Sequence, residues 1–104
     1  MIKVSVLYPN DEGARFDMEY YVRKHVAMIQ RVLGDALKKV EIDEGVSGAA
    51  PGSRPIYIAA VHLYFDSVEV FYESFGPHAA EIKKDVPNYT NVRPLTQIAT
   101  VHSA

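Results

Sequence analysis

The 104-residue sequence contains no cysteine. Disulfide bonds, thiolate nucleophiles and cysteine-based zinc or iron-sulfur sites are therefore excluded. An excess of basic charge is also lacking, because 11 lysines and arginines face 13 aspartates and glutamates, for a formal net charge of -2. The basic residues are scattered between Lys3 and Arg93 without a stripe or tail, so we expect no binding of nucleic acid.

Long apolar segments are missing as well. The longest run, from Ile56 to Phe65, is interrupted by His62 and falls short of the ~20 residues that span a bilayer. The first residues alternate between apolar and polar side chains, which is typical of a strand and not of a signal peptide. These features predict a soluble cytoplasmic protein that does not bind or cross a membrane.

Motifs for several kinds of chemistry are absent too. The four histidines do not form the H-x-H or H-E-x-x-H patterns of metal sites. No glycine-rich loop precedes a helix, as a nucleotide site requires, and no G-x-S-x-G elbow presents a nucleophilic serine. We therefore expect no metal and no cofactor.

The chain does contain enough apolar material for one core. Hydrophobic residues make up 48% of it and charged residues 23%, a balance typical of a folded protein. A length of 104 residues is close to the commonest domain size. The sequence therefore predicts a single domain over residues 1–104.

The hydrophobic pattern switches between strand and helix periods along the chain. A first helix begins at the capping residue Asp17, where apolar residues take up helical spacing. A second begins at Asp66 and Ser67, is broken at Gly76 and Pro77, and continues as a short helical piece. The expected elements are strand 2–8, helix 17–33, strand 37–44, strand 56–65, helix 66–75 with the piece 78–85, and strand 91–102.

This order of elements predicts an α+β protein with the ferredoxin-like split β-α-β fold, in which two helices cover one face of a four-stranded antiparallel sheet. The strand over residues 56–65 is apolar on both faces, so the face without helices needs cover as well. A second copy packed sheet to sheet would supply it, and we therefore expect a homodimer. The turn-rich residues 45–55 form either a lid or a disordered tip.

His25 is the most informative polar residue of the first helix. Helical spacing places it within the apolar stripe, between Val22 and Ile29. A ring in this position is either a core histidine with a satisfied hydrogen bond or a group that lines a cavity. In the second case burial lowers its pKa and keeps the ring neutral at pH 7, the form that acts as a general base.

Tyrosines supply further candidate polar groups. Tyr21 lies one turn before His25 on the same side of the helix, so the two side chains could flank one ligand. Other tyrosines bring hydroxyls from neighbouring elements, and an apolar pocket with a few such groups is typical of a small-molecule site. The candidate substrate-binding residues are Tyr21, Tyr72, Tyr64 and Tyr8.

Two further histidines have two interpretations each. His78 follows the helix break at Gly76 and Pro77, so it is either a second catalytic acid or base, or an exposed loop residue. His62 lies on the strand 56–65 and faces either the pocket or the sheet surface that a second copy would cover.

The first helix also carries Phe16-Asp17, Tyr20-Tyr21 and His25 in the spacing F-D-x-x-Y-Y-x-x-x-H. This string resembles the opening signature of the EthD family, and the similarity covers essentially the whole chain. One departure is Ala27, which stands where the family commonly has a proline. The later landmarks that also resemble the family are Phe65-Asp66-Ser67, Asn91-Val92, Pro94 and Gln97-Ile98.

The resemblance implies membership of the dimeric α/β-barrel superfamily, and with it the ferredoxin-like fold and the homodimer. Relatives in that superfamily include quinone-forming monooxygenases, muconolactone isomerases, polyketide cyclases and haem-degrading enzymes, and several hold a substrate between helices and sheet. The family's histidine corresponds to His25, and its tyrosine pair corresponds to Tyr20 and Tyr21.

These observations favour cofactor-independent acid-base chemistry, of an isomerase, cyclase or monooxygenase type, on an apolar or aromatic carbonyl compound. Neutral His25 would move the proton, with His78 as a second candidate catalytic residue. Two alternatives stay open: a carrier that binds a small ligand without changing it, and a haem-dependent oxidoreductase with His25 or His78 as axial ligand. The fold class does not choose among them, nor does it establish that the protein is an enzyme.

Overall fold

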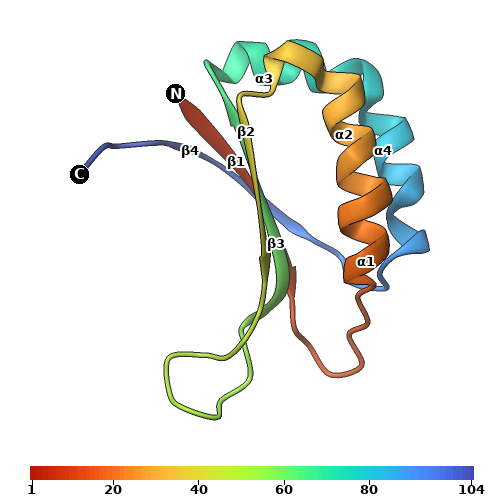
Figure 1. Cartoon of the computed structure of the whole chain (residues 1–104), viewed down its shortest axis with the longest axis vertical. Coiled ribbons are helices and arrows are strands. Elements are labelled where there is room, and N and C mark those ends of the chain that lie inside the picture. The colour runs from red at the N-terminus through yellow and green to blue at the C-terminus, as the bar shows by residue number, and fades with distance from the viewer.

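The computed structural model describes all residues from Met1 to Ala104, and it has two layers (Figure 1). A four-stranded antiparallel sheet with strand order β2-β3-β1-β4 forms one layer, and the helices cover one of its faces. The predicted α+β, ferredoxin-like architecture is confirmed. The elements are β1 (Ile2–Pro9), α1 (Met18–Tyr20), a π-helical turn (Tyr21–His25), α2 (Val26–Leu33), β2 (Lys39–Glu44), β3 (Tyr57–Phe65), α3 (Val68–Phe75), α4 (Ala79–Asp85) and β4 (Leu95–Thr100), with 3₁₀ turns at Gly34–Ala36, Gly76–His78 and Val86–Asn88.

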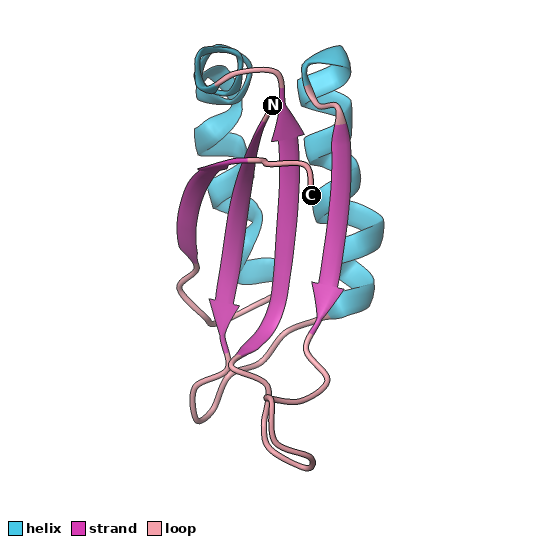
Figure 2. Ribbon diagram, turned by 90° about the vertical axis from the view of Figure 1, so that its left-hand side faces the viewer, coloured by secondary structure: helices cyan, strands magenta, loops and turns pink.

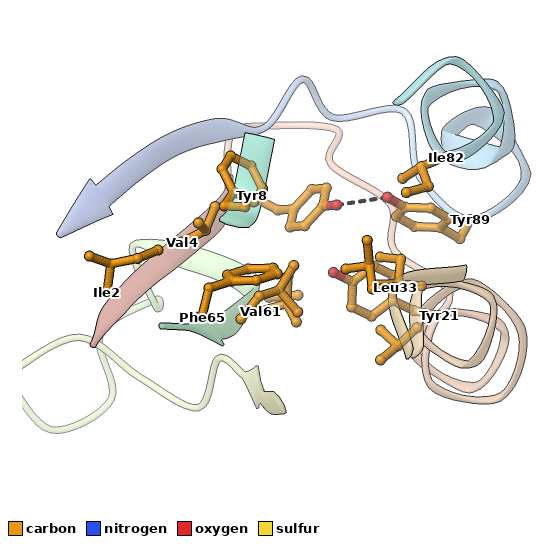
Figure 3. Close-up of a cluster of buried hydrophobic side chains, with 14 residues drawn as sticks. Ile2, Val4, Tyr8, Tyr21, Leu33, Val61, Phe65, Ile82 and Tyr89 are labelled. Carbon is orange, nitrogen blue, oxygen red and sulfur yellow. Dashed lines mark hydrogen bonds between the residues drawn. The ribbon is translucent and has the colours of Figure 1, made fainter. Parts of the chain in front are cut away.

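The core lies between the sheet and the helices. On β1, Val4 and Tyr8 are buried and lie directly opposite the buried Leu63 and Ala59 of β3. Figure 3 shows side chains from the sheet directed toward those of the helices, with Leu33 on the helical side. Because successive side chains of a strand point to opposite faces, the alternation in the sequence indicated the buried face of β1, whereas the sequence of β3 was read as apolar on both faces.

A π turn in the first helix changes which residues face the core. The backbone N–H of Val26 donates to the carbonyl of Tyr21, five residues earlier, instead of four. Regular helical spacing predicted that Val22 is buried, but Val22 is 46% exposed and Val26 is 2% exposed. The extra residue rotates the following turn, so that Val26 faces the core in place of Val22, whereas Tyr21 and His25 are buried as the helical spacing predicted.

Several predicted element boundaries differ from the structure. The second helix starts at Val68 because the Ser67 side chain caps it by accepting a hydrogen bond from the N–H of Val70. The last strand is shorter than the predicted 91–102, because Pro94 has no N–H to donate to the ladder and the strand starts only at Leu95. None of the helices has the length and hydrophobicity that a bilayer span requires.

Figure 2 shows the face of the sheet that carries no helix. One end of this face is polar. His62 points to this face, with its Nδ1 2.7 Å from the Ser5 hydroxyl and its Nε2 2.9 Å from Asp43. Tyr64 also lies on this face and donates to Glu41 at 2.5 Å. The prediction that β3 is apolar on both faces is therefore wrong at this end of the strand, where carboxylates satisfy its polar side chains.

The other end of the open face is apolar. Leu7 and Leu95 lie opposite each other on β1 and β4, and Leu95 is 55% exposed. Ile56, just before β3, is 73% exposed. The loop over residues 45–55 projects beyond this end of the sheet (Figure 1), and its Val46 is 90% exposed.

A substitution of the buried Leu33 tests the position of the core. Its side chain is 5% exposed, so Leu33→Ala should lower the free energy of unfolding by about 2 to 5 kcal/mol, through lost burial and the cavity left behind. Val46→Ala, in the exposed loop, is the control and should change it by less than about 0.5 kcal/mol. Urea unfolding followed by circular dichroism measures both, and equal losses would contradict this core.

Candidate active site

A cavity of about 700 Å³ lies between the helices and the sheet. Its walls come from β1, β3, the first helix, α4 and the segment that leads into β4. Of its 17 lining residues, 11 are hydrophobic. A cavity of this size, with an apolar lining and a few polar groups, is typical of small-molecule sites.

A hydrogen bond between side chains joins the two helices at the wall of this cavity. His25 closes the π turn and is 2% exposed, and its Nδ1 lies 2.9 Å from Oδ2 of Asp85, the last residue of α4. The carboxylate of Asp85 also accepts hydrogen bonds from the Tyr20 hydroxyl at 2.6 Å and the Asn88 amide at 2.9 Å. A carboxylate is disfavoured at the C-terminal end of a helix, and these three donors compensate for that cost.

The pKa values of the pair fix the protonation of His25. Burial lowers the pKa of His25 below its ordinary 6.5, and this effect outweighs the opposing effect of Asp85. Burial acts to raise the pKa of Asp85, but hydrogen bonds from Tyr20, Asn88 and His25 outweigh it and lower that pKa. Asp85 is therefore ionised at neutral pH, and the Nδ1–H of a neutral His25 donates to it. Nε2 keeps its lone pair.

Two tyrosine hydroxyls lie one after the other beyond Nε2 of His25. The hydroxyl of Tyr89 lies 3.4 Å from this nitrogen, and 2.7 Å from the hydroxyl of Tyr8 (Figure 3). Burial raises the pKa of both tyrosines, so both stay protonated. A continuous line of polar groups therefore runs from Asp85 through His25 and Tyr89 to Tyr8.

Tyr21 adds an unused hydrogen-bond donor. Its ring stacks on that of His25, with centroids 5.4 Å apart and an interplanar angle of 18°. Tyr21 is 0% exposed, and its hydroxyl has no hydrogen-bond partner. Burial raises its pKa, so the group remains a neutral hydroxyl. Because a buried polar group without a partner is costly, this hydroxyl is available to an acceptor atom of a ligand in the cavity.

Backbone contacts hold Tyr89 in place although it lies far from His25 in the sequence. The N–H of Asp17 donates to the carbonyl of Tyr89 at 2.8 Å, and the Thr90 hydroxyl donates to the carbonyl of Arg15 at 2.7 Å. These bonds join the segment before α1 to the segment after α4. The Tyr89 ring thereby comes to lie 4.5 Å from that of His25, measured between centroids.

Three of the six residues predicted for the site line this cavity: His25, Tyr21 and Tyr8. Tyr8 projects from β1, and Tyr21 and His25 project from the π turn. The sequence left two interpretations of His25 open: a core histidine with a satisfied hydrogen bond, or a residue that lines a cavity. In the structure His25 has both properties. Nδ1 is satisfied by Asp85, and the ring still lines the cavity.

The other three predicted residues lie elsewhere. Tyr64 is on the opposite face of the sheet. It directly follows the cavity residue Leu63 in β3, and successive side chains of a strand point to opposite faces. Tyr72 is 60% exposed on α3. His78 is half-buried after the helix break, where its Nδ1 lies 3.6 Å from Glu81. None of the three takes part in the arrangement around His25.

Asp85 and Tyr89 also belong to the site, and neither was predicted from the sequence. Asp85 is 60 residues from His25, and no spacing rule connects two residues so far apart. One physical signal was present, because an aspartate in the last turn of a helix opposes the helix dipole and therefore needs donors from elsewhere. Asn88, three residues later, is one of the donors it found.

Comparisons with known proteins agree with this fold. The EthD domain model matches residues 12–93, and none of the curated proteins matches. An EthD-like protein from Ralstonia eutropha is 42% identical with a TM-score of 0.90, over 94% of this chain and 88% of that one. An EthD family protein from Bacillus halodurans is 16% identical with a TM-score of 0.68, over 98% and 99% of the two chains.

A dimeric protein of unknown function with a ferredoxin-like fold, from Bacteroides fragilis, is 15% identical with a TM-score of 0.50, over 96% of this chain and 95% of that one. At such identities the likeness concerns the fold alone. The family assignment depends instead on the domain model and on the Ralstonia eutropha protein. The chain therefore belongs to the EthD family, which its F-D-x-x-Y-Y-x-x-x-H string resembled.

Proposed function

We propose that this protein is a cofactor-independent enzyme that moves a proton on an apolar or aromatic carbonyl compound, with His25 as the catalytic base. The observation that carries the proposal is the environment of His25. The imidazole is buried and neutral, its Nδ1–H is held by Asp85, and its Nε2 has only a long contact of 3.4 Å to Tyr89. A neutral imidazole with a free Nε2 in an apolar cavity is suited to general-base catalysis.

The reaction begins with a ketone whose oxygen accepts a hydrogen bond from the Tyr21 hydroxyl. Nε2 of His25 removes a proton from the carbon next to the carbonyl, and the C–H electron pair moves into an enolate. Tyr21 stabilises the negative charge that develops on oxygen, and Asp85 stabilises the imidazolium. Return of the proton to the same carbon leaves only exchange. If the ketone has a carbon–carbon double bond next to that carbon, the enolate is conjugated with it, and return of the proton to the far end of that system isomerises the compound.

Asp85 acts in this scheme as a positioning residue. It keeps the proton on Nδ1 and therefore keeps the lone pair on Nε2, as a carboxylate does in other histidine-dependent sites. The contact from Nε2 to the Tyr89 hydroxyl, at 3.4 Å, is longer than a normal O–H···N bond. A substrate can therefore approach Nε2 without displacing a strong interaction.

The protein also forms a homodimer in this proposal, through the open face of the sheet. The apolar end of that face leaves Leu95 at 55% exposure and Ile56 at 73%, and monomers rarely leave such a patch in water. The Bacteroides fragilis protein with the same fold is described as dimeric. Two such faces packed together would cover these side chains.

A non-catalytic carrier is the second candidate, because an apolar cavity with 11 hydrophobic lining residues can hold a ligand without changing it. The two functions differ in one measurable respect. A carrier binds a ketone and leaves its C–H bonds intact, whereas the proposed enzyme exchanges the protons next to the carbonyl with solvent.

The proton-transfer step can be measured as deuterium uptake by 2-tetralone in D₂O, followed by NMR. The wild-type protein should accelerate exchange next to the carbonyl, and His25→Gln should reduce the acceleration roughly 100-fold or more, since general-base catalysis contributes about that much. Tyr72→Phe, on an exposed side chain outside the cavity, is the matched control and should leave the rate unchanged. Binding of 2-tetralone without acceleration of exchange would favour the carrier.

The pH dependence of this exchange follows from the lowered pKa of His25. The neutral ring is the base, so the rate should be constant near pH 7 and fall at acid pH with a midpoint below 6.5, the ordinary histidine pKa. Asp85→Asn removes the carboxylate that raises this pKa, so the midpoint should move to still lower pH and the plateau rate should fall. Asp66→Asn, an exposed carboxylate, is the control. A midpoint that rises in Asp85→Asn would contradict this assignment.

The dimer is tested by analytical ultracentrifugation. The wild-type protein should sediment with twice the mass of one chain, and Leu95→Lys should shift it toward the monomer by placing a charge in the apolar contact. Val46→Lys, in the exposed loop, should remain dimeric. A wild-type protein that is monomeric at high micromolar concentration would refute the interface.

A further inference from the structure

The charged residues that line the cavity are all basic. Besides the neutral His25, they are Lys83 on α4 and Arg93 in the segment before β4, and no aspartate or glutamate lines the cavity. In the whole chain, by contrast, acidic residues outnumber basic ones by 13 to 11. The cavity wall therefore has the opposite charge balance from the chain as a whole.

Neither of these cations has a partner within the protein. Other basic side chains do form ion pairs, such as Arg23 with Glu19 and Lys38 with Asp66. Lys83 and Arg93 take part in none of the protein's salt bridges or side-chain hydrogen bonds. Both are exposed, so their charged groups lie where the cavity opens to solvent.

A second observation comes from the buried part of the same cavity. The Tyr21 hydroxyl is buried and has no hydrogen-bond partner. Most of the lining is apolar, with 11 hydrophobic residues among the 17, including Ile82 and Val61. A ligand that satisfied every group would need an anionic end at the opening, an apolar body, and an acceptor oxygen at the inner end.

We propose that the protein takes an apolar ring compound that bears both a carboxylate and a carbonyl oxygen. The carboxylate lies between Lys83 and Arg93, and the carbonyl oxygen accepts the hydrogen bond from Tyr21. This inference deepens the proposed function: it depends on that function for the chemistry at His25, whereas the recognition of the anion does not require turnover.

A carboxylate fits this opening better than a phosphate does. The guanidinium of Arg93 and the ammonium of Lys83 can both donate to a planar carboxylate. Phosphate sites are commonly built from backbone N–H groups at the N-terminus of a helix. Here the helix that carries Lys83 presents its C-terminal end, residues 83–85, and not the N-terminal N–H groups that such a phosphate site uses.

The test compares two probes that differ only in charge, 6-acetyl-2-naphthoate and its methyl ester, by isothermal titration calorimetry. The wild-type protein should bind the acid at least tenfold more tightly than the ester, and the preference should shrink at high salt. The double variant Lys83→Met with Arg93→Met should lose the preference to within twofold and keep its affinity for the ester. The matched control is Lys84→Met with Arg31→Met, two exposed cations outside the cavity, and it should keep the preference.

Tyr21→Phe tests the inner end of the same proposal. It removes one hydrogen bond to the carbonyl oxygen that both probes share, so it should weaken the acid and the ester equally, by about three- to tenfold. Loss of affinity for the acid alone would contradict the orientation proposed here.

Two results would overturn the anion site: equal binding of acid and ester by the wild-type protein, or a double variant that keeps the preference. The exchange of 2-tetralone, which has no carboxylate, separates this outcome from failure of the proposed function. Exchange in the wild-type protein together with no preference for the acid overturns the anion site alone. A preference for the acid without any exchange supports the anion site and overturns proton transfer.

Discussion

The hydrogen bond between Asp85 and His25 is the contact on which the candidate site depends. It joins the end of α4 to the π turn of the first helix across 2.9 Å, and it determines which imidazole nitrogen carries the proton. Tyr20 and Asn88 donate further hydrogen bonds to the Asp85 carboxylate. These bonds stabilise its negative charge, although Asp85 lies at the C-terminal end of a helix, where the dipole disfavours an anion. The rest of the site, including the direction of Nε2, follows from this orientation.

Two opposing effects act on the pKa of His25, and their balance decides whether the ring is neutral or protonated. Burial favours the neutral imidazole, whereas Asp85 favours the imidazolium. The neutral form prevails at rest, but the carboxylate remains in position to stabilise the cation as soon as a proton arrives. Tyr21 shows a similar compromise, because its buried hydroxyl lacks a partner, which costs stability. Natural proteins commonly tolerate such costs at functional sites.

The sequence predicted the features that depend on local periodicity. Alternation along β1 indicated its buried face, and helical spacing placed His25 and Tyr21 on the core side. The same rule failed for Val22 and Val26, because the π turn adds a residue that no local pattern indicated. It also left open the face to which Tyr64 belongs, which depends on the pairing of β3 with its neighbours. Asp85 and Tyr89 were beyond reach, because their meeting with His25 depends on how the ends of two helices are joined by the bonds from Asp17 and Thr90.

The most direct test of the account is the tautomer of His25 at neutral pH, measured by ¹H–¹⁵N NMR of the imidazole ring. The account predicts a neutral ring with its proton on Nδ1, donated to Asp85, and an unprotonated Nε2. A ring protonated on Nε2, or one doubly protonated at pH 7, would contradict it, because His25 would then have no lone pair to offer a substrate in the cavity.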